Sequence, residues 1–241
     1  MGSISRSFSR VGRSSMITQL NDSKISPVSD FTTNEISNIS EIYKDEINIS
    51  IWKRQLSSSL EKSSEYVVNQ NPNLEFSEVL QPKDVNQSLK SAIGSSNEIQ
   101  PFLDDVSYLS FTFCKLFDQK KMWLRLDGID RPMCPRFHTD KLKCRLVTTY
   151  VGPATQWIPH HLVNRSKLGY GNEGKPDNES GLFLSENDIE QLDTGHVALL
   201  KGESWKGNDG EGIVHRSPYE EGNYQRLYMT IDFIETYINI Y

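Results

Sequence analysis

The chain lacks the features that mark three broad classes of protein. Among its 241 residues, no apolar run approaches the roughly 18 residues of a membrane-spanning helix, and no apolar signal-peptide core is visible. It has no dense run of lysine and arginine, and its net charge is -6, which argues against nucleic acid as a partner. We therefore expect neither a membrane nor a nucleic acid as partner, and a cytoplasmic location.

Cysteine is scarce, and its spacing argues against two kinds of site. The chain has 3 cysteines, Cys114, Cys134 and Cys144, with no C-x-x-C pair. An odd number without such a pair argues against a disulfide scaffold and a zinc ribbon, and it is typical of a reducing compartment. Cys114 follows an apolar helical pattern and is expected to be buried, while the other two are interpreted as bystanders of the site described below.

Acidic residues are absent from the first 21 residues, which contain six serines and three arginines. Few side chains there can be buried, so this composition predicts a disordered tail, which we place at residues 1–44. The same bias is typical of organellar transit peptides, which leaves an organellar location as the alternative. Residues 45–241 are expected to form a single α+β domain.

The first part of that domain, residues 45–120, is expected to be mainly helical. Apolar residues alternate with polar ones over 47–51, which predicts a short strand. Apolar residues then recur every four positions from Trp52 onward, so a helix should follow. Two further amphipathic helices are predicted at residues 85–93 and 101–116.

The pattern changes to strands over residues 121–241. Short segments rich in β-branched and aromatic residues alternate there with Gly, Pro, Asn and Asp. They are residues 122–126, 144–151, 155–158, 196–200, 212–215 and 225–233. Strands that follow a helical portion predict an α+β fold whose second half is an antiparallel sandwich or barrel. Residues 160–188 form a long polar segment, which is expected to act as a lid.

The strongest chemical signal is "FHTD", in which His138 and Asp140 stand two residues apart. In an extended chain such residues share one face, so the imidazole and the carboxylate can both face one ion. His215 ends a later strand, and Arg226 follows eleven residues after it. Two histidines and one carboxylate with open positions are the ligand set of a non-haem Fe(II) site. The same set binds Zn(II), and a hydrogen-bonded polar loop also remains possible.

This pattern resembles that of the Fe(II)/2-oxoglutarate-dependent oxygenases. The resemblance implies a double-stranded β-helix, a jelly-roll or cupin-like barrel, in the C-terminal half, flanked by helices from the N-terminal half. It also implies Fe(II) bound by His138, Asp140 and His215, and 2-oxoglutarate held by Arg226. Arg145 is the competing anchor. The alternative function is a zinc-binding or zinc-sensing protein on the same barrel.

A longer string, "CPRFHTD…RLVTTYVGP" continued by "VALLKGE" and "VHRSP", is similar to a narrower group. It resembles the bacterial family catalogued as domain of unknown function 1826, over about Ile47 to Glu235. That resemblance implies no established activity. The substrate therefore stays open.

Strand 225–233 supplies a further cofactor-binding candidate. Successive side chains of a strand point to opposite faces, so Arg226, Tyr228, Thr230 and Asp232 should share one polar face. The apolar residues between them should pack on the helices. We therefore add Thr230 to Arg226 and Arg145 as cofactor-binding candidates, although Arg226 could instead pair with Asp232.

Four residues near these segments are candidates for substrate contact: Trp157, Lys201, Trp205 and Arg216. Trp205 lies in a glycine-rich segment before His215 and could form a wall of the site. Lys201 and Arg216 would suit an anionic substrate. Both tryptophans could instead belong to the core.

Overall fold

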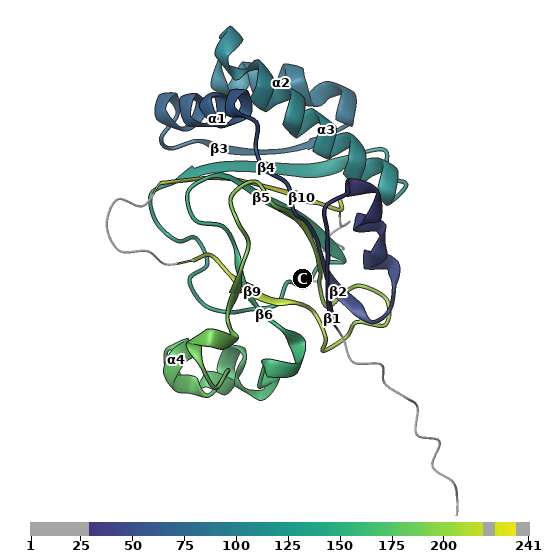
Figure 1. Ribbon diagram of the computed structural model, residues 1–241, viewed down its shortest axis with the longest axis vertical. Helices are drawn as coiled ribbons and strands as arrows, with labels where there is room; N and C mark the ends of the chain where they lie inside the picture. The colour runs from purple at the N-terminus through teal and green to yellow at the C-terminus, as the bar shows by residue number, and fades with distance from the viewer. Residues whose placement is uncertain (1–28, 219–224, 235–241) are drawn as a thin grey trace, which may run out of the picture.

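Two β-sheets of unequal size, with helices packed on the larger one, make up this mixed α/β fold (Figure 1). The computed structural model describes residues 29–218 and 225–234. The larger sheet has the strand order β1-β2-β8-β5-β10-β4-β3, and the smaller has the order β7-β6-β9. The strands are β1 (Ser29–Thr33), β2 (Ile47–Trp52), β3 (Glu75–Leu80), β4 (Met122–Ile129), β5 (Cys144–Val151), β6 (Gln156–Ile158), β7 (Glu190–Gln191), β8 (Val197–Lys201), β9 (Val214–Arg216) and β10 (Arg226–Asp232). The α-helices are α1 (Ser58–Gln70), α2 (Val85–Ile93), α3 (Gln100–Leu116) and α4 (Asp177–Ser180).

Helices α1, α2 and α3 cover one face of the larger sheet, at the top of Figure 1. Leu227, Met229 and Ile231 of β10 join the apolar cluster beneath these helices, whereas the alternate residues of β10 face the other way. The alternation predicted for this strand is therefore confirmed. The predicted helices at α2 and α3 and all six predicted strands are present.

Leu109 of α3 lies fully buried in this cluster, and Phe111 on the same helix is 57% exposed. We expect Leu109→Ala to lower the free energy of unfolding by about 3 kcal/mol, because it removes apolar contacts and leaves a cavity. The matched control, Phe111→Ala, should change it by less than about 0.5 kcal/mol. Urea denaturation of the three proteins measures both values. Equal losses for the two variants would contradict this packing.

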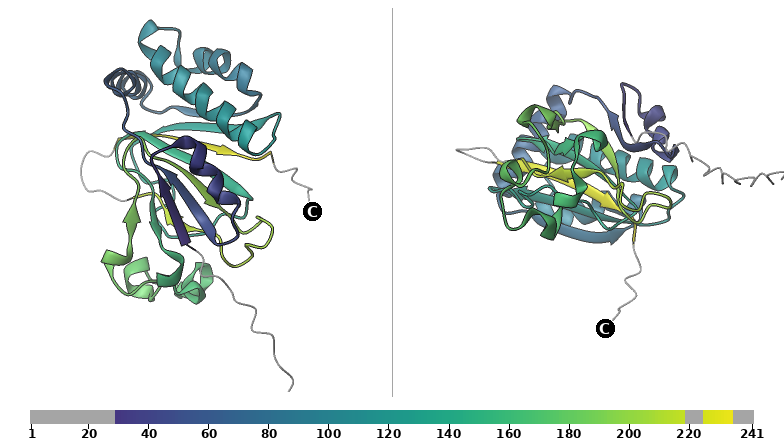
Figure 2. Two further views of the ribbon diagram at one scale, coloured as in Figure 1. Left: turned by 45° about the vertical axis from the view of Figure 1, so that its right-hand side comes forward. Right: turned by 90° about the horizontal axis from the view of Figure 1, so that it is seen from below.

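The predicted tail boundary at residue 44 is wrong for residues 29–44. Strand β1 pairs in parallel with β2, and a 3-10 helix, η1 (Ile36–Tyr43), packs on β2 (Figure 2). Ile39 and Ile42 of that helix are buried. The signal was present in the sequence, because Ile36, Ile39 and Ile42 are spaced three apart, the period of a 3-10 helix, but the composition of the segment was given more weight. Residues 1–28 lie outside the described part of the chain.

The predicted division into a helical portion, 45–120, and a strand portion, 121–241, overlooked a strand in the first portion. Strand β3 lies within the supposed helical portion and pairs with β4 at the edge of the larger sheet. Phe76 is its one fully buried residue, so the segment lacks the apolar pattern of a central strand. The first helix begins at Ser58 rather than near Trp52, because the Ser57 side chain caps it by accepting a hydrogen bond from Leu60 N.

A second apolar cluster fills part of the space between the two sheets. It contains Ile49 and Ile51 of β2, Ala198 and Leu200 of β8, and Trp157 of β6. A third cluster lies under residues 160–188, where Leu182 and Phe183 pack on Phe137. This segment, which includes α4 at the bottom of Figure 1, is thus built on an apolar centre of its own. Whether it acts as a lid stays a prediction.

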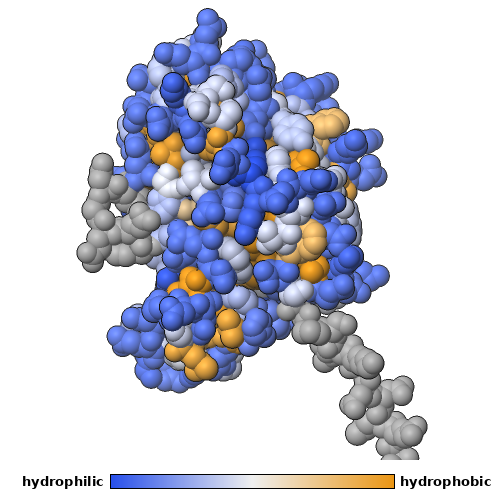
Figure 3. Space-filling view, viewed as in Figure 1, coloured by the Kyte–Doolittle hydropathy of each residue, from blue (hydrophilic) through white to orange (hydrophobic). Residues whose placement is uncertain are grey.

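The face shown in Figure 3 is mostly hydrophilic, with small apolar areas between polar ones. Within residues 29–218 and 225–234, no helix has the length and apolar character needed to cross a membrane.

Candidate metal centre

His138 and His215 are held together by their backbones. Each peptide N–H donates to the carbonyl oxygen of the other residue at 3.0 Å, which forms an isolated antiparallel bridge between the loop before β5 and strand β9. Paired residues of antiparallel strands present their side chains on the same face. The two imidazole rings consequently lie 4.6 Å apart, centroid to centroid.

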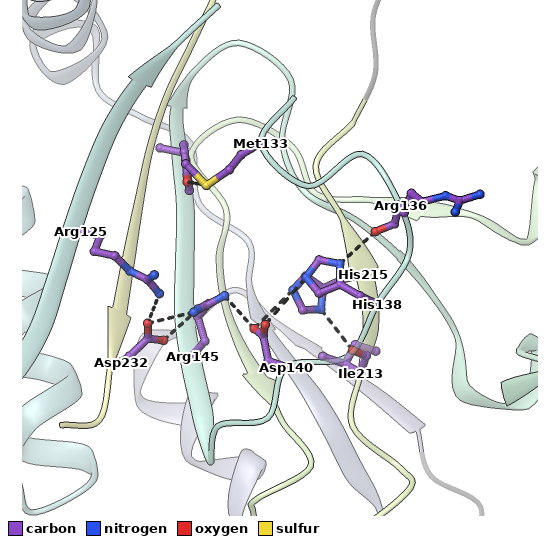
Figure 4. Close-up of polar contacts among 10 residues, drawn as sticks. Arg125, Met133, Arg136, His138, Asp140, Arg145, Ile213, His215 and Asp232 are labelled. Carbon is purple, nitrogen blue, oxygen red and sulfur yellow. Dashed lines mark hydrogen bonds and ion pairs between the residues drawn. The ribbon is translucent and has the colours of Figure 1, made fainter. Parts of the chain in front are cut away.

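Asp140 completes a cluster with these two histidines (Figure 4). Its carboxylate oxygens lie 3.8 Å from His138 Nε2 and 3.5 Å from His215 Nε2. One donor atom from each residue lies within 4.8 Å of the others. Neighbouring ligands placed about 2.1 Å from one ion are roughly 3 Å apart, so a small contraction would fit an ion between them.

The remaining ring nitrogens fix the tautomers. His138 Nδ1–H donates to the Arg136 carbonyl at 2.9 Å, and His215 Nδ1–H donates to the Ile213 carbonyl at 3.1 Å. A carbonyl only accepts, so Nδ1 carries the proton in both rings. The lone pair of each ring is then on Nε2, which faces Asp140, as in histidines that bind metals.

The charges of the cluster suit a cation. Burial lowers the pKa of His215 to about 4, although Asp140 opposes the shift, so this imidazole is neutral at pH 7. Burial acts to raise the pKa of Asp140, but His215 and Arg145 outweigh it and leave that pKa below its ordinary value. The cluster therefore offers one carboxylate and an unprotonated imidazole, which is the state in which such groups bind a metal.

A row of alternating charges leads from Asp140 across the larger sheet (Figure 4). Arg145 Nη1 donates to Asp140 at 2.7 Å, and its other nitrogens donate to Asp232 at 2.8 and 3.0 Å. Arg125 also donates to Asp232. The guanidinium of Arg145 is thus engaged with two carboxylates and orients Asp140, which makes it a poorer anchor for an added acid.

A cavity of about 260 Å³ lies beside the three residues. Strand β10 lines it with Arg226, Tyr228 and Thr230, and Arg145 also borders it. The Oγ1 atom of Thr230 is buried and has no hydrogen-bond partner among the described residues. The wall of the cavity is therefore polar where a core would be apolar.

Arg226 is 1% exposed, and hydroxyl groups surround its guanidinium. It donates to Ser217 Oγ at 3.1 Å and to the Oγ1 atoms of Thr149 and Thr155 at 3.2 and 3.1 Å. It also lies 4.5 Å from the centre of the Tyr228 ring. A buried guanidinium on a cavity wall presents a planar fork of donors that matches the geometry of a carboxylate.

The sequence matches a family model over residues 33–232, with the description "Protein of unknown function (DUF1826)". The chain belongs to the DUF1826 family. No curated protein matches it.

Among solved structures, the DUF1826 chain is similar to the dioxygenase for auxin oxidation of rice. The two share 8% identity and a TM-score of 0.50, over 86% of this chain and 82% of that chain. The Arabidopsis thaliana dioxygenase for auxin oxidation 1, solved as a complex with 2-oxoglutarate, gives 11% identity and a TM-score of 0.47, over 86% and 92%. At 8% identity, the rice enzyme shows a common fold alone.

The DUF1826 chain brings only one of the four substrate candidates to the cavity. Arg216 lines it, held by Gln156 at 2.8 Å and stacked 4.2 Å from the centre of the Phe137 ring. Trp157 is instead buried in the cluster between the sheets. The expectation that Trp157 contacts a substrate is therefore corrected to a core role.

Lys201 and Trp205 lie on the opposite side of the larger sheet from the cavity, which also corrects their expected role. Leu200 of β8 lines the cavity, so its neighbour Lys201 points away from it. Lys201 Nζ donates to the Lys44 carbonyl at 2.6 Å and lies 5.1 Å from the Trp205 ring centre. Trp205 packs against the cluster under the helices.

The sequence interpretation missed Arg125, which lines the cavity from β4. Its signal was present in "MWLRL", where Met122, Leu124 and Leu126 are buried and the residues between them face the other way. An arginine on the same face as the polar residues of β10 could have been assigned to the site from this alternation.

Proposed function

We propose that this protein is an Fe(II)- and 2-oxoglutarate-dependent oxygenase, built on a double-stranded β-helix formed by its two sheets. The observation that carries the proposal is the cluster of His138, Asp140 and His215 at a cavity that Arg226 also lines. The fold shared with a plant dioxygenase supports it.

The donor set fits such a metal. Two imidazole nitrogens and one carboxylate are the facial ligand set that leaves positions open on non-haem Fe(II). All three residues line the cavity, which would offer room for further ligands of such a metal. Arg226, with the hydroxyls of Thr149 and Ser217 around it, fits the far carboxylate of a dicarboxylic acid.

Each of these residues has a role in the proposed site. His138, Asp140 and His215 would hold the metal, and Arg145 would keep the Asp140 carboxylate turned toward it. Arg226 would bind the far carboxylate of 2-oxoglutarate. When bound, iron and 2-oxoglutarate supply the oxidative decarboxylation that activates dioxygen. Val147 and Leu200 add apolar wall to the cavity and would limit the entry of water.

Anaerobic titration tests the proposal. Protein loaded with Fe(II) should develop a weak visible band at roughly 500 nm when 2-oxoglutarate is added, as expected for this chelate. Admission of air should then produce succinate. Retained metal with neither band nor succinate would contradict the oxygenase and support the zinc-binding alternative, which uses the same three ligands. Failure to retain Fe(II) or Zn(II) would contradict both.

A further inference from the structure

A second group of unpartnered donors lies on the wall of the same cavity. Thr230 Oγ1 and Arg125 Nε are both buried, and neither has a hydrogen-bond partner among the described residues. Thr230 of β10 and Arg125 of β4 are directly opposite each other in the antiparallel pairing, so their side chains share one face. Both residues line the cavity. Nine buried polar atoms of the described residues lack a hydrogen-bond partner, and these two are set apart because they belong to residues that lie opposite each other on the cavity wall, where a bound acceptor could pair with both.

These donors stand apart from the proposed anchor for 2-oxoglutarate. Thr230 and Arg226 are four residues apart on β10, so their Cα atoms are about 13 Å apart. Thr230 lies instead toward the end where Arg145 contacts Asp140. A molecule held at Arg125 and Thr230 would therefore lie at the metal end of the cavity. We therefore assign Thr230 to this second group of donors, and no longer to the binding of 2-oxoglutarate.

Two contacts hold the Arg125 side chain in position and do not use its Nε atom. Its Nη2 donates to Asp232, and its guanidinium lies 4.8 Å from the centre of the Trp123 ring. Asp232 also pairs with Arg145, and Arg145 pairs with Asp140 in turn, so these two arginines and two carboxylates balance one another. Asp127, further along β4, and Asp140 also interact electrostatically with Arg125. Burial raises the pKa of Asp127, which weakens its value as a counter-charge.

The same face of the sheet continues from Arg125 to Trp123 and Val79, which lie beyond the residues that line the cavity. Trp123 is paired with Val79 of the edge strand β3, and paired residues share a face. Val79 is 49% exposed, and Trp123 is half-buried. No described helix covers this face, because α1, α2 and α3 pack on the other one. An apolar group can therefore rest on Trp123 and Val79 while an acid group reaches Arg125.

From this arrangement we infer that the substrate is an organic acid with an apolar body, whose carboxylate is bound by Arg125 and Thr230. The inference rests on the proposed function for the identity of the reaction. Its binding part is independent, because the donors belong to the protein and not to the metal. Neutral analogues of the substrate should bind poorly, since a guanidinium forms stronger, charge-assisted hydrogen bonds with a carboxylate than with an amide.

Matched pairs of apolar carboxylic acids and their carboxamides provide the test. The protein is loaded with Ni(II), which does not turn over, and with 2-oxoglutarate, and the binding of each compound is followed by thermal shift. Acids should raise the melting temperature where their amides do not. Arg125→Met and Thr230→Val should each weaken binding of the best acid at least tenfold and leave 2-oxoglutarate affinity within twofold. Both variants should fold, because Arg145 still pairs with Asp232 and valine has the shape of threonine.

Arg131→Met, at an exposed arginine, is the control and should leave acid binding unchanged. Equal shifts by acids and amides would overturn the inference, whether or not the iron complex forms. The inference would also be overturned if Arg125→Met and Thr230→Val weakened the binding of 2-oxoglutarate and not that of the acid. Both residues would then be assigned to 2-oxoglutarate binding, and the proposed function would stand. Loss of the visible band with acid binding intact would overturn the oxygenase alone.

Discussion

His215→Ala should reduce succinate formation to the level of metal-free protein. It removes one of three ligands, and metal affinity should fall by more than roughly 100-fold, the loss that even a change behind a ligand can cause. The fold should survive, because the bridge to His138 is made by backbone atoms and an alanine retains it. Elemental analysis of the purified variant and a succinate assay measure the two effects.

The matched control is His161→Ala, at an exposed histidine outside the cluster. It should retain both metal and activity. If His215→Ala instead kept its metal and its turnover, the cluster would be a polar pair within the loop, and the enzyme proposal would fail. A melting temperature close to that of the parent protein would show that the comparison concerns the site and not the fold.

Part of the metal cluster could be predicted from the sequence because its geometry is local: His138 and Asp140 share a face in any extended segment. His215 was added to them by the resemblance to the oxygenases, and the structure brings it to His138 through a bridge between distant segments. The alternation of polar and apolar residues placed Arg226 on the inner face of β10, where the structure has it. Strand period is a short-range property, so placing His138 with Asp140 and placing Arg226 on the inner face needed no knowledge of their partners.

The wrong predictions concern residues whose positions depend on segments far away in the sequence. Lys201 was assigned to the site because its charge suits an anionic substrate, but its position in β8 directs its side chain toward the Lys44 carbonyl. The role of Arg145 depends on Asp232, 87 residues further along the chain. Edge strand β3 carries little apolar pattern because exposed Glu78 stands between Phe76 and Leu80 on the face that would otherwise be apolar. Such pairings are set by sheet order, which a single sequence does not reveal.

Arg226→Met should weaken 2-oxoglutarate binding by roughly 1,000-fold, or about 4 kcal/mol. Two hydrogen bonds from a buried guanidinium to a carboxylate contribute about 1.5–3 kcal/mol each, and methionine can make neither. The 2-oxoglutarate affinity of Arg226→Lys should lie between those of Arg226→Met and the parent protein, since lysine keeps the charge but lacks the planar fork of donors. Titration of the visible band with 2-oxoglutarate gives the three affinities.

The metal content separates an anchor from a structural arginine. Arg226 also holds the hydroxyls of Thr149, Thr155 and Ser217, so its loss could disturb β10 as a whole. If Arg226 acts as the anchor, the variants keep full metal occupancy and regain the band at high 2-oxoglutarate. If both variants bind 2-oxoglutarate within threefold of the parent, the anchor lies elsewhere. Arg145, which pairs with Asp140 and Asp232, would then be the next candidate anchor to test.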